Sequence, residues 1–455
     1  MSETPDSPET PETPETAQTP ETPDSAERPK RLGVGQPMPK VPQLGQPMPQ
    51  MPRRKMRIVR GVRRAPQEAL RFLRVETTGG ILLLIGAALA LIVANTPLSH
   101  LYEEIRHTYI GIDGVFMLSV QHWAADFLLA FFFLVVGLEL KRELVVGELR
   151  DIKQAMLPII AAAGGIIVPA GIALAVAWGE PGAADVWPVP VATDIAFALA
   201  ILALCAKNLP SSLRIFLLTL AIADDLGAIA MIAALYSKPQ VLPLLIFVAV
   251  VALWVFLQAK RVRSLWIYIP LGLVAWFALF EADVHATIAG VALGLATRVK
   301  RDKGEHESPA VAAEHKIQPF SAGFAVPVFA FFSAGVVLNG ESLSAFATDR
   351  VALAVVAGLF LGKAIGVTLG AFAAYKFGWG RLAPDLKWPD IAGVAILCGC
   401  GFTVSLLITE LAFTDLAQQD LVKTGVLAGS AISALVGAAV LSRRSRTVRR
   451  VAAQV

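Results

Sequence analysis

Long apolar runs separated by short polar segments occupy the chain from residue 79 to residue 442. Most of these runs approach the ~20 residues that a helix needs to cross a membrane. Several are shorter, which predicts tilted, interrupted or partly buried helices. The pattern predicts an all-α polytopic membrane protein with about twelve transmembrane spans, at approximately residues 79–96, 121–140, 155–178, 190–206, 213–236, 241–258, 265–281, 285–298, 320–339, 351–376, 389–411 and 422–442.

The composition agrees with a membrane protein. Of 455 residues, 55% are hydrophobic and 17% are charged, whereas soluble domains are nearer a quarter charged. The net charge of +4 is too small to indicate nucleic-acid binding, so membrane lipids are the expected surroundings. The three cysteines, Cys205, Cys398 and Cys400, lie in apolar runs without a further Cys or His beside them. They are better interpreted as small core residues than as metal ligands.

The two ends of the chain differ from this apolar region. Residues 1–52 are rich in Pro, Thr and Glu and have too few apolar residues to bury a core, which predicts a disordered cytoplasmic tail. Residues 53–78 begin with a run of Arg and Lys and predict a membrane-surface segment. The transmembrane domain is then residues 79–442, and residues 443–455 form a basic cytoplasmic C-terminal tail.

Lysines and arginines predict the orientation in the membrane. One set of loops carries Lys141, Arg142, Arg150, Lys153, Lys207, Arg214, Lys260, Arg261, Arg263, Arg298, Lys300, Arg301, Lys303, Lys316, Lys376, Arg381 and Lys387. The opposite set carries only Arg106, Lys238, Arg350 and Lys423. Because basic loops stay in the cytoplasm, both termini are expected there. An even number of spans agrees with that arrangement.

Two adjacent aspartates, Asp224 and Asp225, lie in the middle of the span 213–236. A carboxylate near the centre of a bilayer costs roughly 2.5–3.5 kcal/mol on insertion scales, so a pair is expected to have a function. Successive residues of a helix point about 100° apart. One carboxylate could line an aqueous cavity and bind a cation while the other pairs with a base. A buried pair that only holds helices together is the alternative to this cation or proton pathway.

A third intramembrane acid, Asp194, lies in PVPVATDIAFALAI, with Pro188 and Pro190 upstream and Thr193 beside it. Proline disrupts a helix, and unwound backbone at membrane depth is tolerated only where it lines a cavity or is buried in protein. The freed carbonyls and the Thr193 hydroxyl could bind a hard cation. Alternatively, Asp194 caps the half-helix that follows, and both roles can hold together.

A second interruption is predicted in LCGCGFTVSLLI, residues 397–408, where Gly399 and Gly401 flank a cysteine. Interrupted spans in corresponding halves of a chain indicate the binding site of a transporter. If the two spans cross, Asp194 could neutralise the positive ends of their half-helices. Glycines that only permit tight helix packing are the alternative.

Lys363 lies in AGLFLGKAIGVTLG, beside a stripe of small residues formed by Gly358, Gly362, Gly366 and Gly370. The stripe predicts close helix packing. Lys363 is too central to reach water easily, so it needs an acid partner or must lose its proton. Asp224 is the candidate partner. Such a pair can release protons when Na⁺ binds the neighbouring carboxylate, although a purely structural ion pair fits as well.

Charges at the ends of two spans are candidates for pH sensing. Glu139, Arg142 and Glu143 share a helix face at the end of the second span. They could gather cations at a cytoplasmic funnel, or they could form a solvated helix end. His285 begins the eighth span, and an unperturbed histidine titrates near neutral pH. A lone histidine in that position is more often simply hydrogen-bonded.

Other function classes lack their motifs. The double Asp is preceded by Ala223 and followed by Leu-Gly-Ala, which matches neither intramembrane aspartyl proteases nor DDxxD prenyl-transferring enzymes. No nucleotide-binding G-x-x-x-x-G-K-[ST] loop is present, and no channel filter motif is found. The chain is therefore predicted not to be an enzyme. A sodium-coupled carrier of an organic solute, with a similar broken-helix core, is the main alternative to a cation/proton exchanger.

Seven segments in order resemble the bacterial NhaA family of Na⁺/H⁺ antiporters. They are GLELKREL (137–144), ATDIAFAL (192–199), AIADDLGAI (221–229), VHATIAGV (284–291), LGKAIG (361–366), CGCGFTVS (398–405) and KTGVLAGSAISALVG (423–437). The resemblance implies twelve helices with two inverted repeats, roughly spans 3–5 and 10–12, in which spans 4 and 11 are broken and cross. It implies a bacterial cell-membrane location and a role in pH homeostasis.

The resemblance also assigns roles to residues. It makes Asp225 the main Na⁺-binding carboxylate with Asp224 as its partner, and Lys363, Asp194 and Thr193 contributors to the charge balance. It assigns pH sensing to Glu139, Arg142, Glu143 and His285, and the unwound part of span 11 to Gly399 and Gly401. The Asp-Asp pair resembles the electrogenic type, which moves more protons than Na⁺ or Li⁺, with no organic cofactor. The Asp113-Gly114 turn between spans 1 and 2 looks like the family's dimer-forming periplasmic β-hairpin.

Three features depart from the family pattern. They are the long N-terminal tail, the charged stretch 300–316, and Cys400 where an aliphatic residue is expected between the two glycines. We expect them to affect regulation and the pH profile more than the basic reaction, which is predicted to be pH-regulated extrusion of Na⁺ by alternating access.

Overall fold

The computed structural model describes residues 78–452 except for 114–115, 148–149, 151 and 238. The predicted disordered tail and nearly all of the basic membrane-surface segment lie outside the described residues. So do Gly114 and Lys238, and the side chain of Lys153 is not described either.

Almost every element is a helix. The first half of the chain has Thr78–Ala94, α2 (Ser99–His107), α3 (Val120–His122), the π-helix η1 (Trp123–Leu128), α4 (Leu129–Val145), α5 (Ile152–Val176), α6 (Ala183–Val186), the 3₁₀ turn η3 (Val189–Val191), α7 (Ile195–Cys205) and α8 (Ser211–Leu235). The second half has α9 (Val241–Ala259), α10 (Leu265–Glu281), α11 (Ile288–Ala296), α12 (Pro309–Phe320), π-helix η4 (Ser321–Ala325), α13 (Val326–Ser333), α14 (Gly340–Thr348), α15 (Arg350–Ala357), π-helix η5 (Gly358–Gly362), α16 (Lys363–Lys376), α17 (Trp388–Leu397), α18 (Phe402–Ala412) and α19 (Leu416–Ala452).

Within the described residues, six helices are long and apolar enough to cross a membrane: Val120–Val145, Ala155–Val176, Ser211–Leu235, Val241–Ala259, Arg350–Lys376 and Leu416–Arg450. Three more candidates are bent pairs, so the count rises to nine if each pair is one span. The pairs are Thr78–Ala94 with α2, bent by 116°, α6–η3 with α7, and α17 with α18. The chain is thus a helical polytopic membrane protein. The predicted number of twelve spans stays a prediction.

The charged stretch before the predicted span 320–339 is the main difference from the sequence expectation. Residues 309–319 were expected to belong to a loop, but they form α12, and the helix continues through η4 and α13 only to Ser333. The Ser308 side chain caps α12, and Pro309 occupies its first turn. Glu314 is fully buried because Arg142 of α4 pairs with it, at 2.7 Å between Nη1 and Oε2. The charged residues of this segment made it resemble a loop, although the pairing of Glu314 with Arg142 allows it to form a buried helix.

The helix α14 and the length of α19 were not expected from the sequence. α14 is a short helix with an Asn339 capping box, in which the Asn339 side chain accepts the Ser342 amide at 2.7 Å. α19 does not end at residue 442 but continues through the basic residues 443–450 to Ala452.

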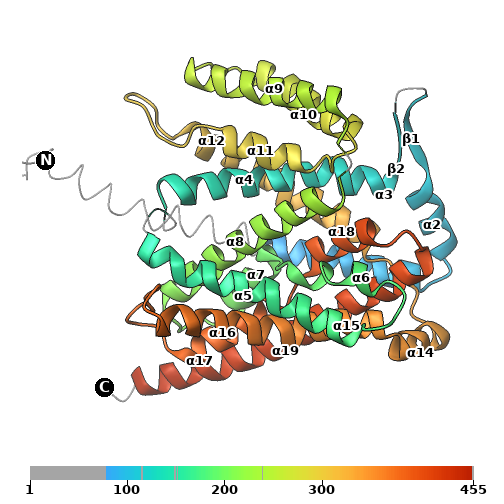
Figure 1. Cartoon of the computed structure of the whole chain (residues 1–455), viewed down its shortest axis with the longest axis vertical. Coiled ribbons are helices and arrows are strands. Elements are labelled where there is room, and N and C mark those ends of the chain that lie inside the picture. Colours follow the sequence, from blue (N-terminus) through green and yellow to red (C-terminus); the bar gives the residue numbers. More distant parts are fainter. Residues whose placement is uncertain (1–77, 114–115, 148–149, 151, 238, 453–455) are drawn as a thin grey trace, which may run out of the picture. The chain divides into compact units, whose positions relative to one another are not determined.

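A two-stranded hairpin follows α2. Strands β1 (Tyr109–Ile112) and β2 (Phe116–Ser119) are antiparallel, with Tyr109 opposite Ser119 and Ile112 opposite Phe116. The hairpin stands beside α2 at the edge of the helices (Figure 1). The predicted β-hairpin is thus confirmed, with Asp113 at the start of its turn.

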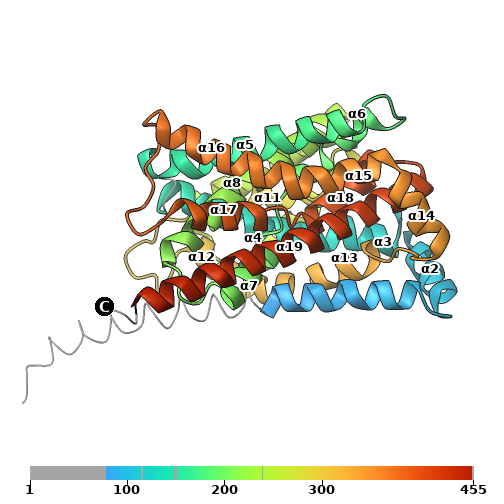
Figure 2. The same cartoon turned by 90° about the horizontal axis from the view of Figure 1, so that it is seen from below.

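The helices α5 and α16 pack closely against each other. The two helices lie side by side in both views (Figures 1 and 2). A Cβ on Gly362 would lie 2.5 Å from Cα of Pro169, and one on Gly370 would lie 2.5 Å from the Ile160 carbonyl oxygen. The glycine stripe therefore lets the two backbones touch, as predicted. α19 runs past α15 and α17 on the other flank (Figure 2).

Candidate functional site

Two interrupted helices meet near the middle of the bundle. α6–η3 and α7 are bent by 46° across residues 192–194, and α17 and α18 are bent by 44° across residues 398–401. The backbone amide of Asp194 donates to the Cys400 carbonyl at 2.6 Å, and the Ser405 hydroxyl donates to the Val189 carbonyl at 2.6 Å. Each interruption therefore satisfies backbone groups of the other.

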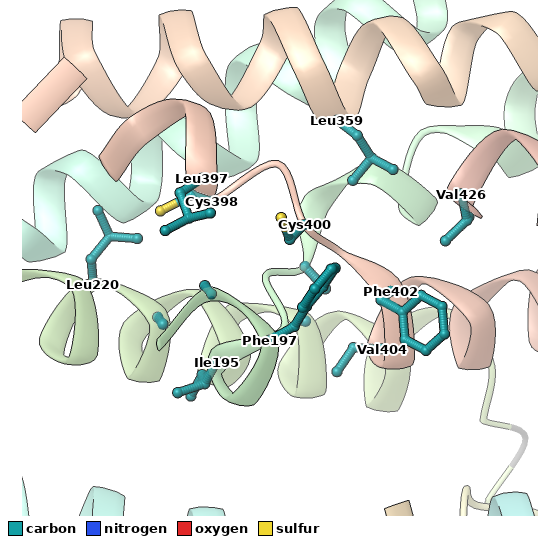
Figure 3. Close-up of a cluster of buried hydrophobic side chains, with 14 of the residues drawn as sticks. Ile195, Phe197, Leu220, Leu359, Leu397, Cys398, Cys400, Phe402, Val404 and Val426 are labelled. Atoms are coloured by element: carbon teal, nitrogen blue, oxygen red, sulfur yellow. The ribbon is translucent and has the colours of Figure 1, made fainter. Parts of the chain in front are cut away.

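The linker between α17 and α18 runs extended past the start of α7 (Figure 3). A Cβ on Gly399 would overlap the Leu359 carbonyl oxygen, and a Cβ on Gly401 would lie 3.1 Å from the Ala192 carbonyl oxygen. These glycines permit a close approach of backbones at the interruption. Cys400 is fully buried in the surrounding apolar cluster, as is Cys398. Both thus lie in the core, as expected for small core residues.

Prolines shape the other interruption. Pro188 precedes η3, and Pro190 lies within it. Pro190 is buried, and its ring would be 2.7 Å from a Cβ on Gly358, so η3 packs directly on η5. Proline supplies no amide for a continuing helix. The chain consequently leaves the helical path after Val191 and resumes it at Ile195.

Asp194 caps two helices at once. Its Oδ1 accepts the Phe197 amide of α7 at 3.0 Å. Its Oδ2 accepts the amide of Thr403 in α18 at 3.2 Å and the Thr403 hydroxyl at 2.8 Å. The predicted cap of the following half-helix is thus confirmed, and the same carboxylate also faces the N-terminus of the second half-helix. Its negative charge lies between two positive helix ends.

Asp224 forms the predicted pair with Lys363. Both side chains are fully buried, and Lys363 Nζ donates to Asp224 Oδ2. The Thr193 hydroxyl lies 2.6 Å from the same oxygen and 3.0 Å from the Cys398 carbonyl oxygen. This hydroxyl therefore connects the α8 carboxylate with both interruptions.

The position of Lys363 follows from the π-helix η5, which ends at Gly362. A π-helix inserts an extra residue per turn and so shifts the face on which the following side chains lie. Lys363 also lies close to α5, because a Cβ on Gly165 would be 3.8 Å from its Nζ. The glycine-rich turn before the lysine thus both admits α5 and directs Lys363 toward Asp224.

Asp225 differs from its neighbour. It is 1% exposed, and neither carboxylate oxygen has a hydrogen-bond partner in the described residues. Oδ1 of Asp224 is unpartnered as well. Buried carboxylate oxygens are normally satisfied, so such atoms indicate a place where a ligand or a proton binds. One member of the aspartate pair binds a base and the other does not, as the helix geometry predicted.

The predicted funnel residues lie at the end of α4. Glu139 is buried, and Arg142 contacts Glu314 at 2.7 Å and Glu143 at 4.0 Å. His285 lies between α10 and α11, with Nδ1 3.5 Å from Oδ1 of Asp126. These groups thus come from α4 and from the segment between α10 and α11, whereas Asp224 and Asp225 belong to α8.

Sequence reasoning missed several partners. Thr403 of α18, whose amide and hydroxyl donate to Asp194, lies within the CGCGFTVS motif, but no feature of the sequence indicated its role. Glu314 and Asp126 are the partners of Arg142 and His285. Asp126 lay in the second predicted span, where an intramembrane acid is itself a signal. Arg106 and Lys423, which had been assigned to loops, are buried at 5% and 0% exposure.

The assembled residues have the chemical groups that an exchange of a cation for protons requires. It offers oxygen atoms of carboxylates, a hydroxyl and backbone carbonyls, which are the ligands of hard cations. It also holds an ammonium group and carboxylates whose protons compete with a bound cation for the same charge. Its residues come from α7, α8, α16 and α18 and the two interruptions, so a relative shift of these elements would alter it.

The comparisons with known proteins agree with this chemistry. The family model described as Na⁺/H⁺ antiporter 1 matches residues 70–441. The Na⁺/H⁺ antiporter NhaA 1 of Saccharopolyspora erythraea is 50% identical over 380 residues, covering 83% of this chain and 92% of that protein. The Na⁺/H⁺ antiporter NhaA 2 of Rhodococcus jostii is 48% identical over 384 residues, covering 83% and 93%, and the Nocardia farcinica NhaA is 48% identical over 387 residues, covering 85% and 93%. The chain therefore belongs to the NhaA family of bacterial Na⁺/H⁺ antiporters, and sodium/proton antiport is its activity.

Proposed function

We propose that this antiporter extrudes Na⁺ or Li⁺ at a site centred on Asp225, with Asp224, Asp194, Thr193 and Lys363 around it. The observation that carries the proposal is the Asp225 carboxylate, buried and without a hydrogen-bond partner among the described residues. A charged group in such a position needs either a proton or a cation. Na⁺ and protons would compete for it, which is the essential property of an exchanger.

Lys363 and Asp224 would provide the charge balance. While Asp225 is protonated, the Lys363 ammonium needs only Asp224 to neutralise it. A cation on Asp225 adds a positive charge nearby and favours release of a proton from the Lys363–Asp224 pair. With the proton displaced from Asp225, more than one proton then moves per monovalent ion. The exchange would be electrogenic.

The proposed membrane arrangement has twelve spans with inverted repeats and both termini in the cytoplasm. The two pairs bent by 46° and 44° support broken spans 4 and 11 that cross, because their interruptions hydrogen-bond to each other. The basic residues on one set of loops support the orientation. Alternating access would then expose the aspartates to one side at a time.

Regulation and assembly complete the proposal. Glu139, Arg142, Glu143 and His285 would respond to pH. The hairpin would mediate a homodimer within the lipid bilayer. Every residue of β1 is exposed, which supports an edge available to a second copy. The transported ions are the only metals required, with no organic cofactor and no nucleic-acid partner.

Na⁺-driven dequenching of a pH probe in everted vesicles with an acid interior tests the site. Wild type should respond to Na⁺ and Li⁺ between about pH 6.5 and 9, and Asp225→Asn should not, because an amide has no negative charge to attract a cation. Asp283→Asn is the matched control. Asp283 is exposed and adopts φ of 55°, a conformation that Asn tolerates.

Two outcomes would contradict the proposal. Antiport retained by Asp225→Asn at normal expression would remove Asp225 from the site. A wild-type rate unchanged when valinomycin and K⁺ clamp the membrane potential at different values would refute electrogenic exchange.

A further inference from the structure

A second group of buried charges lies at the far end of α18. Nζ of Lys423, a fully buried residue of α19, donates to Oε1 of Glu410 at 3.0 Å. The same oxygen accepts Nε2 of Gln121 at 2.6 Å, and Oε1 of Gln121 accepts Nε of Arg106 at 2.6 Å. We call these four residues the tether. None of them belongs to the ion site proposed above.

The tether connects elements that are distant in the sequence. Lys423 and Glu410 join α19 to α18, while Gln121 and Arg106 lie in α3 and α2. These two short helices flank the β1–β2 hairpin, so the Arg106–Gln121 bond closes the base of the hairpin. The hairpin is thus attached to α18 through a continuous series of side-chain hydrogen bonds.

α18 is the half-helix that meets the ion site. Its first turn supplies the Thr403 amide and hydroxyl to Asp194. Thr403 and Glu410 are seven residues apart, which places them on the same face and about 10.5 Å apart along the helix. Asp194 therefore holds one end of this face and the tether holds the other.

The helix α18 is connected to its neighbours by non-helical segments at both ends. The interruption 398–401 precedes it, and the chain leaves the helix again at Phe413. An eleven-residue helix between two breaks can slide or rotate unless directional contacts prevent it. Buried ion pairs contribute little to net stability but can specify one arrangement over others. The tether has the composition and position for that task.

We propose that the tether positions α18 for ion binding, so that Thr403 stays on Asp194 and the ion site keeps its affinity. Its members are positioning residues that never touch the ion. The inference rests on the proposed role of Asp194 in the ion site. The inference adds that hydrogen bonds link the base of the hairpin, through α18, to the ion site.

Gln121→Met is the mildest test, because it breaks the connection and leaves the Lys423–Glu410 pair in place. We expect the apparent KM for Na⁺ in vesicles to rise roughly 3- to 10-fold, the range in which a remote residue modulates a site. The maximal rate should stay within about two-fold, since Asp225 and Lys363 are untouched. Glu180→Gln, which alters an exposed pair with Arg350, is the control and should leave KM unchanged.

A double-mutant cycle tests whether the effect passes through Thr403. Thr403→Val removes the hydroxyl bond to Asp194 and keeps the amide bond. Gln121→Met should then raise KM by less than about two-fold in the Thr403→Val background, because the contact it protects is already lost. Fold-changes that simply multiply would overturn the proposal.

Neutralising the pair separates positioning from stability. Glu410→Gln alone leaves Lys423 buried without its acid and can fail to fold. Glu410→Met with Lys423→Met removes both charges and also the oxygen that accepts from Gln121. Thermal stability should then be near that of wild type while KM remains raised. A wild-type KM in this double variant would overturn the proposal. So would a more than ten-fold loss of maximal rate at unchanged KM, which would place Glu410 in the path of the ion. Failure of the ion site itself would show separately, as antiport by Asp225→Asn.

Discussion

Asp194→Asn should destabilise the protein because one carboxylate serves two helix ends. Oδ1 accepts the Phe197 amide and Oδ2 accepts the amide and hydroxyl of Thr403. An amide side chain has one acceptor oxygen and one NH₂ donor. Whichever way it turns, one backbone N–H then faces a donor in a buried site.

The expected loss can be estimated from these contacts. A buried N–H without a partner costs about 1–3 kcal/mol, and a lost charge beside two helix N-termini costs about 0.3–2 kcal/mol. Together they predict a decrease of about 1–5 kcal/mol in the free energy of unfolding.

Unfolding of purified protein in mixed micelles with increasing SDS measures this decrease. Asp349→Asn is the matched control, since Asp349 caps only α15, with Oδ1 accepting the Ala352 amide at 2.6 Å. Its other hydrogen bonds, from the Gln418 side chain, are long, at 3.3 and 3.4 Å. Asn caps one helix as well as Asp does, so the control should stay within about 0.5 kcal/mol of wild type. Equal losses in both variants, or no loss in either, would refute the idea that Asp194 holds two helices.

Three further changes follow from contacts described above. Lys363→Met should lower the free energy of unfolding by about 3–5 kcal/mol, because it leaves the buried Asp224 without its base. Adding Asp224→Asn should recover most of this loss, and a double variant that is equally unstable would contradict the reasoning. Gly362→Ala places a methyl group 2.5 Å from a backbone carbon of α5 and should cost about 1–3 kcal/mol in the same assay, whereas Gly171→Ala, with nothing within 4 Å, should be neutral or stabilising by up to about 1 kcal/mol. Hydrogen bonds from a guanidinium and a backbone amide lower the pKa of Glu305 from 4.5 to about 2. The ionised Glu305 therefore stabilises the loop between α11 and α12 fully above pH 4.5, and this stabilisation is lost as the pH falls toward 2. Glu305→Gln should already raise amide hydrogen exchange in residues 297–309 at pH 7, and unchanged exchange would argue against this role.

Local features of the sequence predicted much of the site. The angle between neighbouring helix residues separated the roles of Asp224 and Asp225, and the need of a buried ammonium for an acid predicted the partner of Lys363. Both follow from one residue and its immediate surroundings. The glycine stripe was predicted for the same reason, whereas the hairpin was expected only from the resemblance to the family.

Most other contacts between distant segments could not be predicted in this way. Thr403 reaches Asp194 only because the two interruptions meet, and no periodicity in either segment indicates that meeting. Glu314 lies in a charged stretch that resembles a loop until Arg142 is placed opposite it. Lys423 was interpreted as a loop residue because its acid, Glu410, comes from another helix. In each case a partner far along the chain decides whether a charge can be buried.

The hydrogen bonds between the two interruptions can form only after the ribosome has synthesised both segments. Asp194 and its partner Thr403 are 209 residues apart in the chain. At about 5–20 residues per second, a ribosome needs roughly 10–40 seconds to make the segment between them. During that interval the unwound backbone around Asp194 has no partner from the second interruption, so it must stay in contact with water or with the insertion machinery. Biogenesis of this transporter therefore includes a waiting period that ends only when the second half of the chain arrives.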